Sequence, residues 1–290
     1  MSEAKPRVGV LGLGALGMPI ALRLLDGGFS VAAHDLSEQR LAAFRDAAGV
    51  AGTVGAQAVL DATVLCVVTP DADALWDLIS GTSGGLDTGR VETILLHSTV
   101  LPQAARELAV RMGENGVTVI DAPVSGGPDL ARDGQLTLLL GSDGDLGPAG
   151  PVLSALGQQA FRLGPVGAAS AVKLANQLVL FASVAGLHEG LRLTEAFGVG
   201  EAAALEALAT ATGDTWAGRS WGFFDTLAAS YDDAGTPPGR RPWRKDLEEF
   251  VVAAEGAAVG SALAAHLAAS VGDQIELHAR SRVVTEGEQA

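Results

Sequence analysis

The sequence predicts an α/β domain with a doubly wound, mostly parallel sheet over residues 1–164, followed by an all-α domain over residues 165–290. Up to residue 163, short β-type runs alternate with helical patterns, which is typical of parallel strands joined by right-handed crossover helices. After Gly164 the β-type runs stop and only helical patterns follow. The domain boundary is therefore expected near residue 164.

The predicted strands are RVGVL, SVAAH, TVLCVV, TILLH, VTVID, QLTLLLG and QAFRL. The helical patterns of the first domain cover residues 15–27, 37–47, 71–79, 101–112 and 145–157. Those of the second cover residues 168–197, 201–212, 218–230 and 246–280. Gly198, Gly213 and the loop 232–243 separate them, because the two adjacent prolines of that loop exclude a helix.

Composition and charge narrow the possible partners. The 290 residues are 48% hydrophobic, enough for a sizeable core, and the net charge of −15 would repel a nucleic acid or an anionic membrane. The single cysteine, Cys66, cannot form an intrachain disulfide and is expected in the core of a protein from a reducing compartment. The N-terminus does not resemble a signal peptide, so a cytoplasmic location is expected.

Two apolar stretches bear on membranes and assembly. Residues 251–270 approach membrane-spanning length, but they are Ala-rich and carry Glu255 and His266, which favours a helix packed inside the protein. Residues 178–187 are apolar on nearly every side of a helix and must be covered all round. We therefore expect a homodimer or homotetramer formed through the all-α domain.

A glycine-rich turn follows the first strand. In GLGALG the residues Gly12, Gly14 and Gly17 have the spacing G-x-G-x-x-G, which provides a tight turn, close backbone approach to a pyrophosphate and close helix–strand packing. Leu13, Ala15 and Leu16 complete the turn, and the following helix N-terminus attracts anions. Between a strand and a helix, this pattern predicts a dinucleotide site.

The second predicted strand leads to Asp35, 21 residues after Gly14. A carboxylate there accepts hydrogen bonds from both ribose hydroxyls of NAD and repels the 2′-phosphate of NADP. The nearest arginine is Arg40, so NAD is favoured over NADP. In the alternative interpretation, Asp35 merely caps the next helix.

Residues 121–127, DAPVSGG, follow a strand at the edge where open α/β sheets bind ligands. Ser125 provides a hydroxyl, and Gly126 and Gly127 allow backbone N–H groups to face a carboxylate, as in anion-binding nests. The predicted ligand is a small carboxylate substrate. The alternative is an ordinary turn rich in proline and glycine.

Two further loops, VVTPD and HSTVLP, are expected at the same edge. Thr69 and Pro70 of the first and Thr99 of the second are candidates for contact with a nicotinamide, and Thr99 also for contact with substrate. Ser and Thr after a strand also serve as helix caps, which is the alternative. His97 is a candidate general base, but a lone histidine at a strand end is more often structural. No metal site is predicted.

The segment AVKLANQL carries one of only three lysines in a chain with 16 arginines. Lys173, Asn176 and Gln177 share one face of the predicted helix, with Ser170 one turn earlier. A desolvated lysine releases a proton near neutral pH, whereas arginine does not, so lysine here favours proton transfer. The alternative is that this lysine arose by random drift and has no catalytic role. Lys245, in RKDLEEF, is either a second candidate or a helix-start charge.

Four segments resemble, in order, the signatures of the β-hydroxyacid dehydrogenases, which include 3-hydroxyisobutyrate dehydrogenase and tartronate semialdehyde reductase. They are GLGALGMPIALRLL, DAPVSGGPDLARDGQLTLLLGS, GPVGAASAVKLANQL and RKDLEEF, and they span nearly the whole chain. The resemblance implies a Rossmann domain followed by an all-α domain, a nicotinamide cofactor and an essential lysine at Lys173. It also implies that Ser125, Gly126, Gly127 and Asn176 hold the substrate and that Lys245 lies over cofactor and substrate.

Some residues depart from the family pattern. His97 stands where an aspartate is common, Gln177 stands where a second asparagine is common, and RRPW before Lys245 is an unusual insertion. The form KLANQ is similar to the tartronate semialdehyde branch, whereas GRSW at 218–221 resembles the hydroxyisobutyrate enzymes. These two similarities point to different substrates, so the sequence does not decide between the branches.

The resulting hypothesis is reversible oxidation of a 3-hydroxy acid by NAD, with Lys173 as general acid and base. Two alternatives remain. One is reduction of a small semialdehyde or of a C=N bond, although the related imine reductases usually lack both DAPVSGG and the lysine. The other is an inert NAD-binding module.

Overall fold

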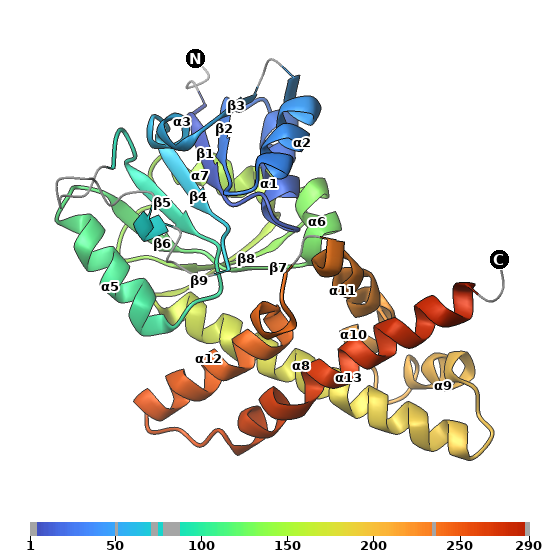
Figure 1. The fold of residues 1–290 in the computed structure, drawn as a ribbon. Helices are drawn as coiled ribbons and strands as arrows, with labels where there is room; N and C mark the ends of the chain where they lie inside the picture. The colour runs from blue at the N-terminus through green and yellow to red at the C-terminus, as the bar shows by residue number, and fades with distance from the viewer. Residues whose placement is uncertain (1–4, 50–51, 71–74, 78–87, 234–235, 288–290) are drawn as a thin grey trace. The chain divides into compact units, whose positions relative to one another are not determined.

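The computed structural model describes residues 5–49, 52–70, 75–77, 88–233 and 236–287. The chain divides into two compact units, Met1–Lys173 and Leu174–Ala290 (Figure 1). The first unit contains the sheet and the second is helical, and helix α8 (Ala168–Ala196) continues from one into the other. The division thus falls inside a helix, whereas the β structure ends at Gly164, the predicted boundary.

The first unit is built on one nine-stranded sheet with the order β3-β2-β1-β4-β5-β6-β8-β7, and β9 pairs with β8. The strands are β1 (Val8–Leu11), β2 (Val31–His34), β3 (Gly52–Val54), β4 (Val64–Val67), β5 (Thr93–Leu96), β6 (Thr118–Asp121), β7 (Val124–Ser125), β8 (Thr137–Gly141) and β9 (Gln159–Gly164). From β3 to β6 every pair is parallel, but β8 pairs antiparallel with β6 and β7. The mostly parallel sheet is confirmed, and β3 and β7 are additions to the prediction.

Helices cover both faces of this sheet (Figure 1). One apolar cluster joins the sheet to α1 (Gly17–Asp26), α2 (Glu38–Ala48), α6 (Gly127–Asp133) and α7 (Ala149–Leu156). The cluster on the other face includes α3 (Ala56–Leu60) and α5 (Pro102–Gly113). The doubly wound arrangement is confirmed, and Cys66 is fully buried in the core as predicted. The predicted helix 71–79 lies outside the described residues except for 75–77, which are helical.

The parallel strands bring the candidate loops to one edge of the sheet. Pairing continues one residue beyond the strand ends, with hydrogen bonds from Gly12 N to His34 O (2.8 Å), from His97 N to Val67 O (3.0 Å) and from Ala122 N to Leu96 O (2.9 Å). These bonds fix the start of the loops that carry the predicted site residues. Neighbouring strands therefore place their chemistry-bearing loops in adjacent positions.

The helical unit contains α9 (Glu201–Leu208), α10 (Trp216–Arg219), α11 (Phe223–Asp233), the 3-10 turn η2 (Pro238–Arg240), α12 (Pro242–Gly256) and α13 (Ala262–Gly287). The prediction of single helices over 218–230 and 246–280 was wrong. Backbone with positive φ interrupts both, at Gly222 (φ 93°) and at Ala258 (φ 55°). The segment 251–270 is therefore divided between two helices. Among the residues that the structure describes, one helix, α8, is long and apolar enough to span a membrane, and 39% of that window is buried.

The RRPW insertion forms part of the core of the helical unit. Trp243 and Arg241 are each 1% exposed. Arg241 Nη1 donates to both carboxylate oxygens of Glu276 (2.8 Å each), and Nη2 pairs with Asp232. A buried guanidinium is tolerated only when its donors are satisfied in this way. The insertion therefore stabilises the junction of α11, α12 and α13.

Candidate active site

The glycine-rich turn between β1 and α1 leaves open space at its middle glycine only. A Cβ on Gly12 (φ 93°) would lie 2.4 Å from Val68 O, and one on Gly17 would lie 1.9 Å from Gly12 O. No atom lies within 4 Å of the corresponding position on Gly14. The first and third glycines are therefore required by the turn, and the second leaves a gap for close approach of a ligand. This geometry fits the pyrophosphate of a dinucleotide.

The other turn residues act through their backbone. Leu13 is buried with the core at 2% exposure, and its N–H donates to Asp35 Oδ2 (2.7 Å). Ala15 and Leu16 are half-buried, and α1 begins directly after them. The positive end of that helix dipole therefore faces the space above Gly14.

Asp35 orders the turn instead of capping the next helix. Its Oδ2 accepts the Leu13 N–H, and its Oδ1 accepts the N–H of Ser37 (2.8 Å). The N-cap of α2 is Ser37, whose Oγ accepts from Arg40 N at 3.4 Å. Arg40 Nη1 lies 3.5 Å from Asp35 Oδ2, so a cation stands beside the carboxylate that is predicted to contact the ribose. The sequence indicated the carboxylate but not this pairing.

The loops after β4 and β5 are joined by a serine that sequence reasoning missed. The Thr69 N–H donates to Ser98 Oγ (3.2 Å), and the Thr69 and Ser98 hydroxyls lie 3.3 Å apart. Pro70 is exposed and Thr99 is half-buried. The N-cap residue of α5 is Leu101, which makes no side-chain cap. Ser98 was recognisable only as a hydroxyl between two candidate residues.

His97 is held by the neighbouring strand. Its side chain is 3% exposed, and Nδ1 lies 2.7 Å from Ala122 O. A carbonyl accepts, so Nδ1 carries the proton; Nε2 is buried and, within the described part of the chain, has no hydrogen-bond partner. Burial lowers the pKa of His97 to about 4, against the opposing effect of the Ala122 bond. A neutral, weakly basic imidazole fits a structural role better than a general base.

The His97 environment predicts a pH effect on stability. Between pH 6.5 and 4 the unfolded chain binds a proton that the folded chain does not, so this contribution is present above pH 6.5 and is lost as pH falls toward 4. At pH 5 the loss amounts to about 2 kcal/mol. Urea unfolding at pH 7.5 and pH 5.0 should show a smaller pH difference for His97→Gln than for wild type. Equal differences in the two proteins would contradict a neutral buried His97.

The DAPVSGG segment forms a short strand and then a helix start. Ser125 lies in β7 and is half-buried, and Gly126 (φ 137°) and Gly127 (φ 80°) adopt conformations that favour glycine. A Cβ on Gly126 would lie 3.0 Å from Leu130 Cδ1. The glycines are therefore required by the turn, and they also leave backbone without side chains next to the Ser125 hydroxyl. Both interpretations of this segment are compatible with its geometry.

The polar residues on this face of α8 differ in how deeply they are buried. Gln177 is 6% exposed, and its Nε2 donates to Asp246 Oδ2 of α12 (2.7 Å), so this side chain links two helices. Asn176 is exposed and donates from Nδ2 to Gln177 Oε1 (3.1 Å). Lys173 is half-buried. The structure thus gives Gln177 a packing role that the helical spacing did not indicate.

Lys245 lies in the first turns of α12, where its ammonium is 3.3 Å from Asp246 Oδ1 and 3.1 Å from Glu249 Oε1. Two carboxylates of its own helix therefore hold this lysine. The predicted contact with a cofactor stays a prediction.

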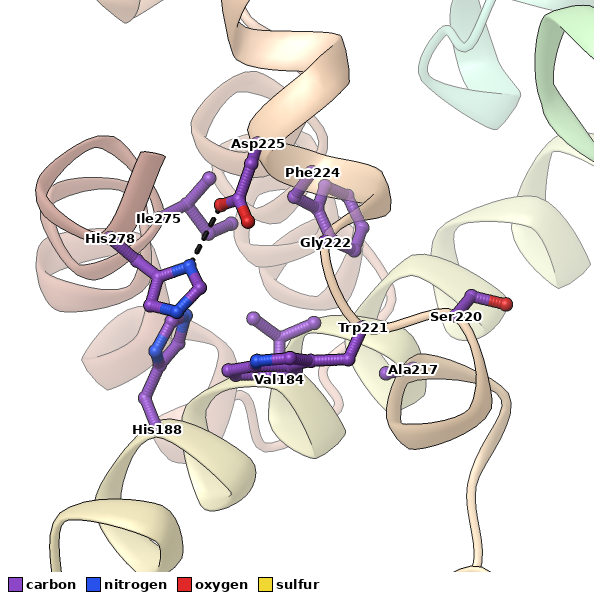
Figure 2. Close-up of a pocket in the computed structure, with 10 residues that line it drawn as sticks. All are labelled: Val184, His188, Ala217, Ser220, Trp221, Gly222, Phe224, Asp225, Ile275 and His278. Carbon is purple, nitrogen blue, oxygen red and sulfur yellow. Dashed lines mark hydrogen bonds and ion pairs between the residues drawn. The ribbon is translucent and has the colours of Figure 1, made fainter. Parts of the chain in front are cut away.

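A second polar cluster lies inside the helical unit and was not indicated by the sequence. His278 Nδ1 bonds Asp225 Oδ1 (2.8 Å), and its ring lies 5.1 Å from that of His188 and 5.0 Å from that of Trp221 (Figure 2). The bond to Asp225 raises the pKa of His278, whereas burial lowers that of His188 to about 4. The adjoining pocket holds about 10 Å³, roughly the room for one water molecule, too little for a substrate.

Comparison with known proteins assigns the chain to a family. Residues 7–164 match the NAD binding domain of 6-phosphogluconate dehydrogenase. The chain is 33% identical to 2-(hydroxymethyl)glutarate dehydrogenase of Eubacterium barkeri over 74% of its own length and 72% of that protein. It is 31% identical to 3-hydroxyisobutyrate dehydrogenase of Pseudomonas aeruginosa over 72% and 71%. The chain belongs to the β-hydroxyacid dehydrogenase family.

Solved structures with little sequence identity share the fold. A 3-hydroxyisobutyrate dehydrogenase from Salmonella typhimurium superposes with a TM-score of 0.75, covering 92% of this chain and 93% of that one at 23% identity. An imine reductase from Pseudomonas sp. gives a TM-score of 0.65 with the same coverages at 22% identity. As a β-hydroxyacid dehydrogenase, the chain is an oxidoreductase that acts on hydroxy acids and has an NAD(P)-binding domain. In the described part of the chain, no group of three His, Cys, Asp or Glu residues is placed to hold a metal.

Proposed function

We propose that this dehydrogenase oxidises a 3-hydroxy acid reversibly with NAD and that Lys173 is its general acid and base. The observation that carries the proposal is the gap above Gly14 beside the Asp35 carboxylate, which fits a dinucleotide in a chain whose matching relatives are hydroxy-acid dehydrogenases. Solved structures of this fold include both hydroxy-acid and imine enzymes, so the fold does not distinguish the two reactions and only the site residues can.

The residues assigned to the cofactor are the turn 12–17, Asp35, Thr69, Pro70, Thr99 and Lys245. A nicotinamide bound there would supply the hydride acceptor for the substrate carbinol carbon. The Asp35 carboxylate favours the ribose diol of NAD. Arg40 is the competing feature, because a freed guanidinium would attract the 2′-phosphate of NADP. A solved relative of the same fold binds NADP+.

The residues assigned to the substrate hold a carboxylate and a hydroxyl. The backbone at Gly126 and Gly127 and the Ser125 hydroxyl bind the carboxylate, and the amides of Asn176 and Gln177, with Thr99, orient the hydroxyl. Gln177 contributes indirectly, through its bond to Asn176. Lys173 accepts the hydroxyl proton during oxidation and returns it during reduction. General acid–base help of this kind is worth about 10²–10⁴-fold in rate.

The proposal is tested by absorbance at the NADH band with NAD and NADP across a panel of 3-hydroxy acids, including 3-hydroxyisobutyrate and 2-(hydroxymethyl)glutarate. We expect turnover with NAD on at least one of them and a lower kcat/KM with NADP, because Asp35 repels the 2′-phosphate. A preference for NADP would overturn the role given to Asp35. Reduction of tartronate or succinic semialdehyde or of cyclic imines, without oxidation of any hydroxy acid, would favour the second candidate function, which the imine reductase fold supports.

We also propose that the protein is a cytoplasmic homodimer or homotetramer assembled through its helical unit. Large apolar side chains of that unit remain exposed in the single chain, among them Val179 (67%), Leu193 (62%), Phe197 (81%) and Leu277 (69%). Such a surface is typical of a contact between subunits. Neither a nucleic acid nor a membrane is proposed as a partner, given the charge of −15.

An inert NAD-binding module would show NAD binding without turnover on any panel member.

A further inference from the structure

Asp121, the first residue of DAPVSGG, is fully buried and accepts hydrogen bonds from Gly167 and Ser170, where α8 begins. Its Oδ2 accepts the N–H groups of Gly167 (2.9 Å) and Ser170 (2.8 Å), and its Oδ1 accepts the Ser170 hydroxyl (2.6 Å). Burial raises the pKa of Asp121, and the bonds from Ser170 and Gly167 oppose this effect. All these residues belong to the first unit, which ends at Lys173. The Asp121 carboxylate, at the end of strand β6, therefore acts as an N-cap for helix α8.

The backbone around this contact has little freedom to move. Gly141 pairs with Asp121 across β6 and β8, and a Cβ there would lie 3.2 Å from Asp121 Oδ2 and 2.7 Å from Pro165 O. Gly167 adopts φ 92°, and Arg106 Nε donates to Val166 O (3.2 Å). The turn that leads into α8 is thus held directly before the residues that Asp121 binds.

Ser170 lies one helical turn before Lys173 on the same face. The rise over three residues is only about 4.5 Å. A rotation of the first turn about the helix axis, or a shift along it, therefore moves Lys173 by nearly the same amount. A misplacement of about 1 Å is enough to cost a catalytic group roughly 10²-fold in rate. The anchor at Ser170 therefore fixes the stretch of helix from which the Lys173 side chain extends.

We propose that Asp121 is a positioning residue for proton transfer, which it supports by fixing the first turn of α8 and thereby the orientation of Lys173. The proposal rests on the proposed function of Lys173. It also explains why two separate signature segments, DAPVSGG and GPVGAASAVK, occur together: a carboxylate at the start of one is the cap of the other. Asp121 itself touches neither substrate nor cofactor in this assignment.

The test compares Asp121→Asn and Ser170→Ala with wild type. An Asn side chain has one acceptor oxygen, so it cannot accept on both atoms as the carboxylate does, and its amide hydrogens would face N–H or O–H donors. Asp121→Asn should lower kcat by about 10- to 100-fold while leaving KM for NAD within about twofold. Ser170→Ala should lower kcat less, because two backbone donors remain, and Ser170→Thr, which keeps the hydroxyl, should restore it.

Ser183→Ala provides the matched control, because Ser183 also lies on α8 but its Oγ donates to Val179 O of the same helix. We expect wild-type kcat for this variant. A melting curve of each variant separates loss of folded protein from loss of rate. If Asp121→Asn does not fold, the Ser170 pair and this control decide the question on their own.

A second readout needs no turnover. Reductive ¹³C-methylation labels the three lysines, at positions 5, 173 and 245, and substitution to arginine assigns each signal. Asp121→Asn and Ser170→Ala should move the Lys173 signal and leave those of Lys5 and Lys245 in place. Unchanged kcat with an unmoved Lys173 signal would overturn the proposal, as would equal movement of all three signals. Should Lys173→Arg be active, the proposed function fails, but the NMR comparison still shows whether Asp121 positions that side chain.

Discussion

Replacing Lys173 by arginine is expected to lower kcat by about 10²–10⁴-fold without weakening NAD binding. Arginine keeps the positive charge, but it cannot release a proton near neutral pH, so a loss of rate separates proton transfer from simple charge. The measurement is steady-state kinetics on the best substrate of the panel, together with the Kd of NAD from fluorescence titration.

Lys5→Arg is the control for this experiment, because Lys5 is exposed and bonds the backbone at Gly27 in the first unit. It should keep the wild-type kcat. A Lys173→Gly variant that regains rate on addition of a small primary amine would support proton transfer directly. If Lys173→Arg keeps near wild-type kcat, Lys173 is not the acid and base.

The glycine-rich turn predicts opposite outcomes for two similar substitutions. In Gly14→Ala the new methyl group meets no protein atom within 4 Å, so the melting temperature should stay near that of wild type. The same methyl group occupies the space assigned to the pyrophosphate, which should cost about 1–3 kcal/mol of binding, roughly 5- to 150-fold in the Kd of NAD.

In Gly17→Ala the Cβ would lie 1.9 Å from Gly12 O, so backbone must move. We expect a loss of about 3 kcal/mol in the free energy of unfolding, or roughly 6–12 °C in melting temperature. Calorimetry and NAD titration of both variants decide the assignment. A Gly14→Ala protein that binds NAD as tightly as wild type would show that the dinucleotide lies elsewhere.

Much of the fold follows from the sequence because its elements are long or strongly patterned. The seven predicted strands and the alternation of β-type runs with helices are present, since buried parallel strands give continuous apolar runs. The strands β3 and β7 were missed because three and two residues are too short to show alternation. The helix break near Ala258 was missed because alanine carries no local signal for positive φ.

Some residues of the candidate site were likewise predictable from the sequence, and others were not. Gly12, Gly17 and Asp35 were predictable from spacing, because a turn and a strand end fix their positions within the local chain. Gln177 was not, because its partner Asp246 lies 69 residues away and helical spacing shows only which residues share a face. The role of Asp121 was hidden for the same reason: its donors come 46 and 49 residues later.

The cap of α8 also has a consequence for the order in which the chain folds. The acceptor for its first turn is not in the helix or next to it but at the end of β6, and β8, β9 and the turn after Gly164 come between them in the chain. Until that part of the sheet has formed, the first turn of α8 lacks its carboxylate cap, and pairing strands that lie far apart in the chain is slow compared with forming a helix. The N-terminal turn of the longest helix should therefore become stable late, after the central and antiparallel strands have paired.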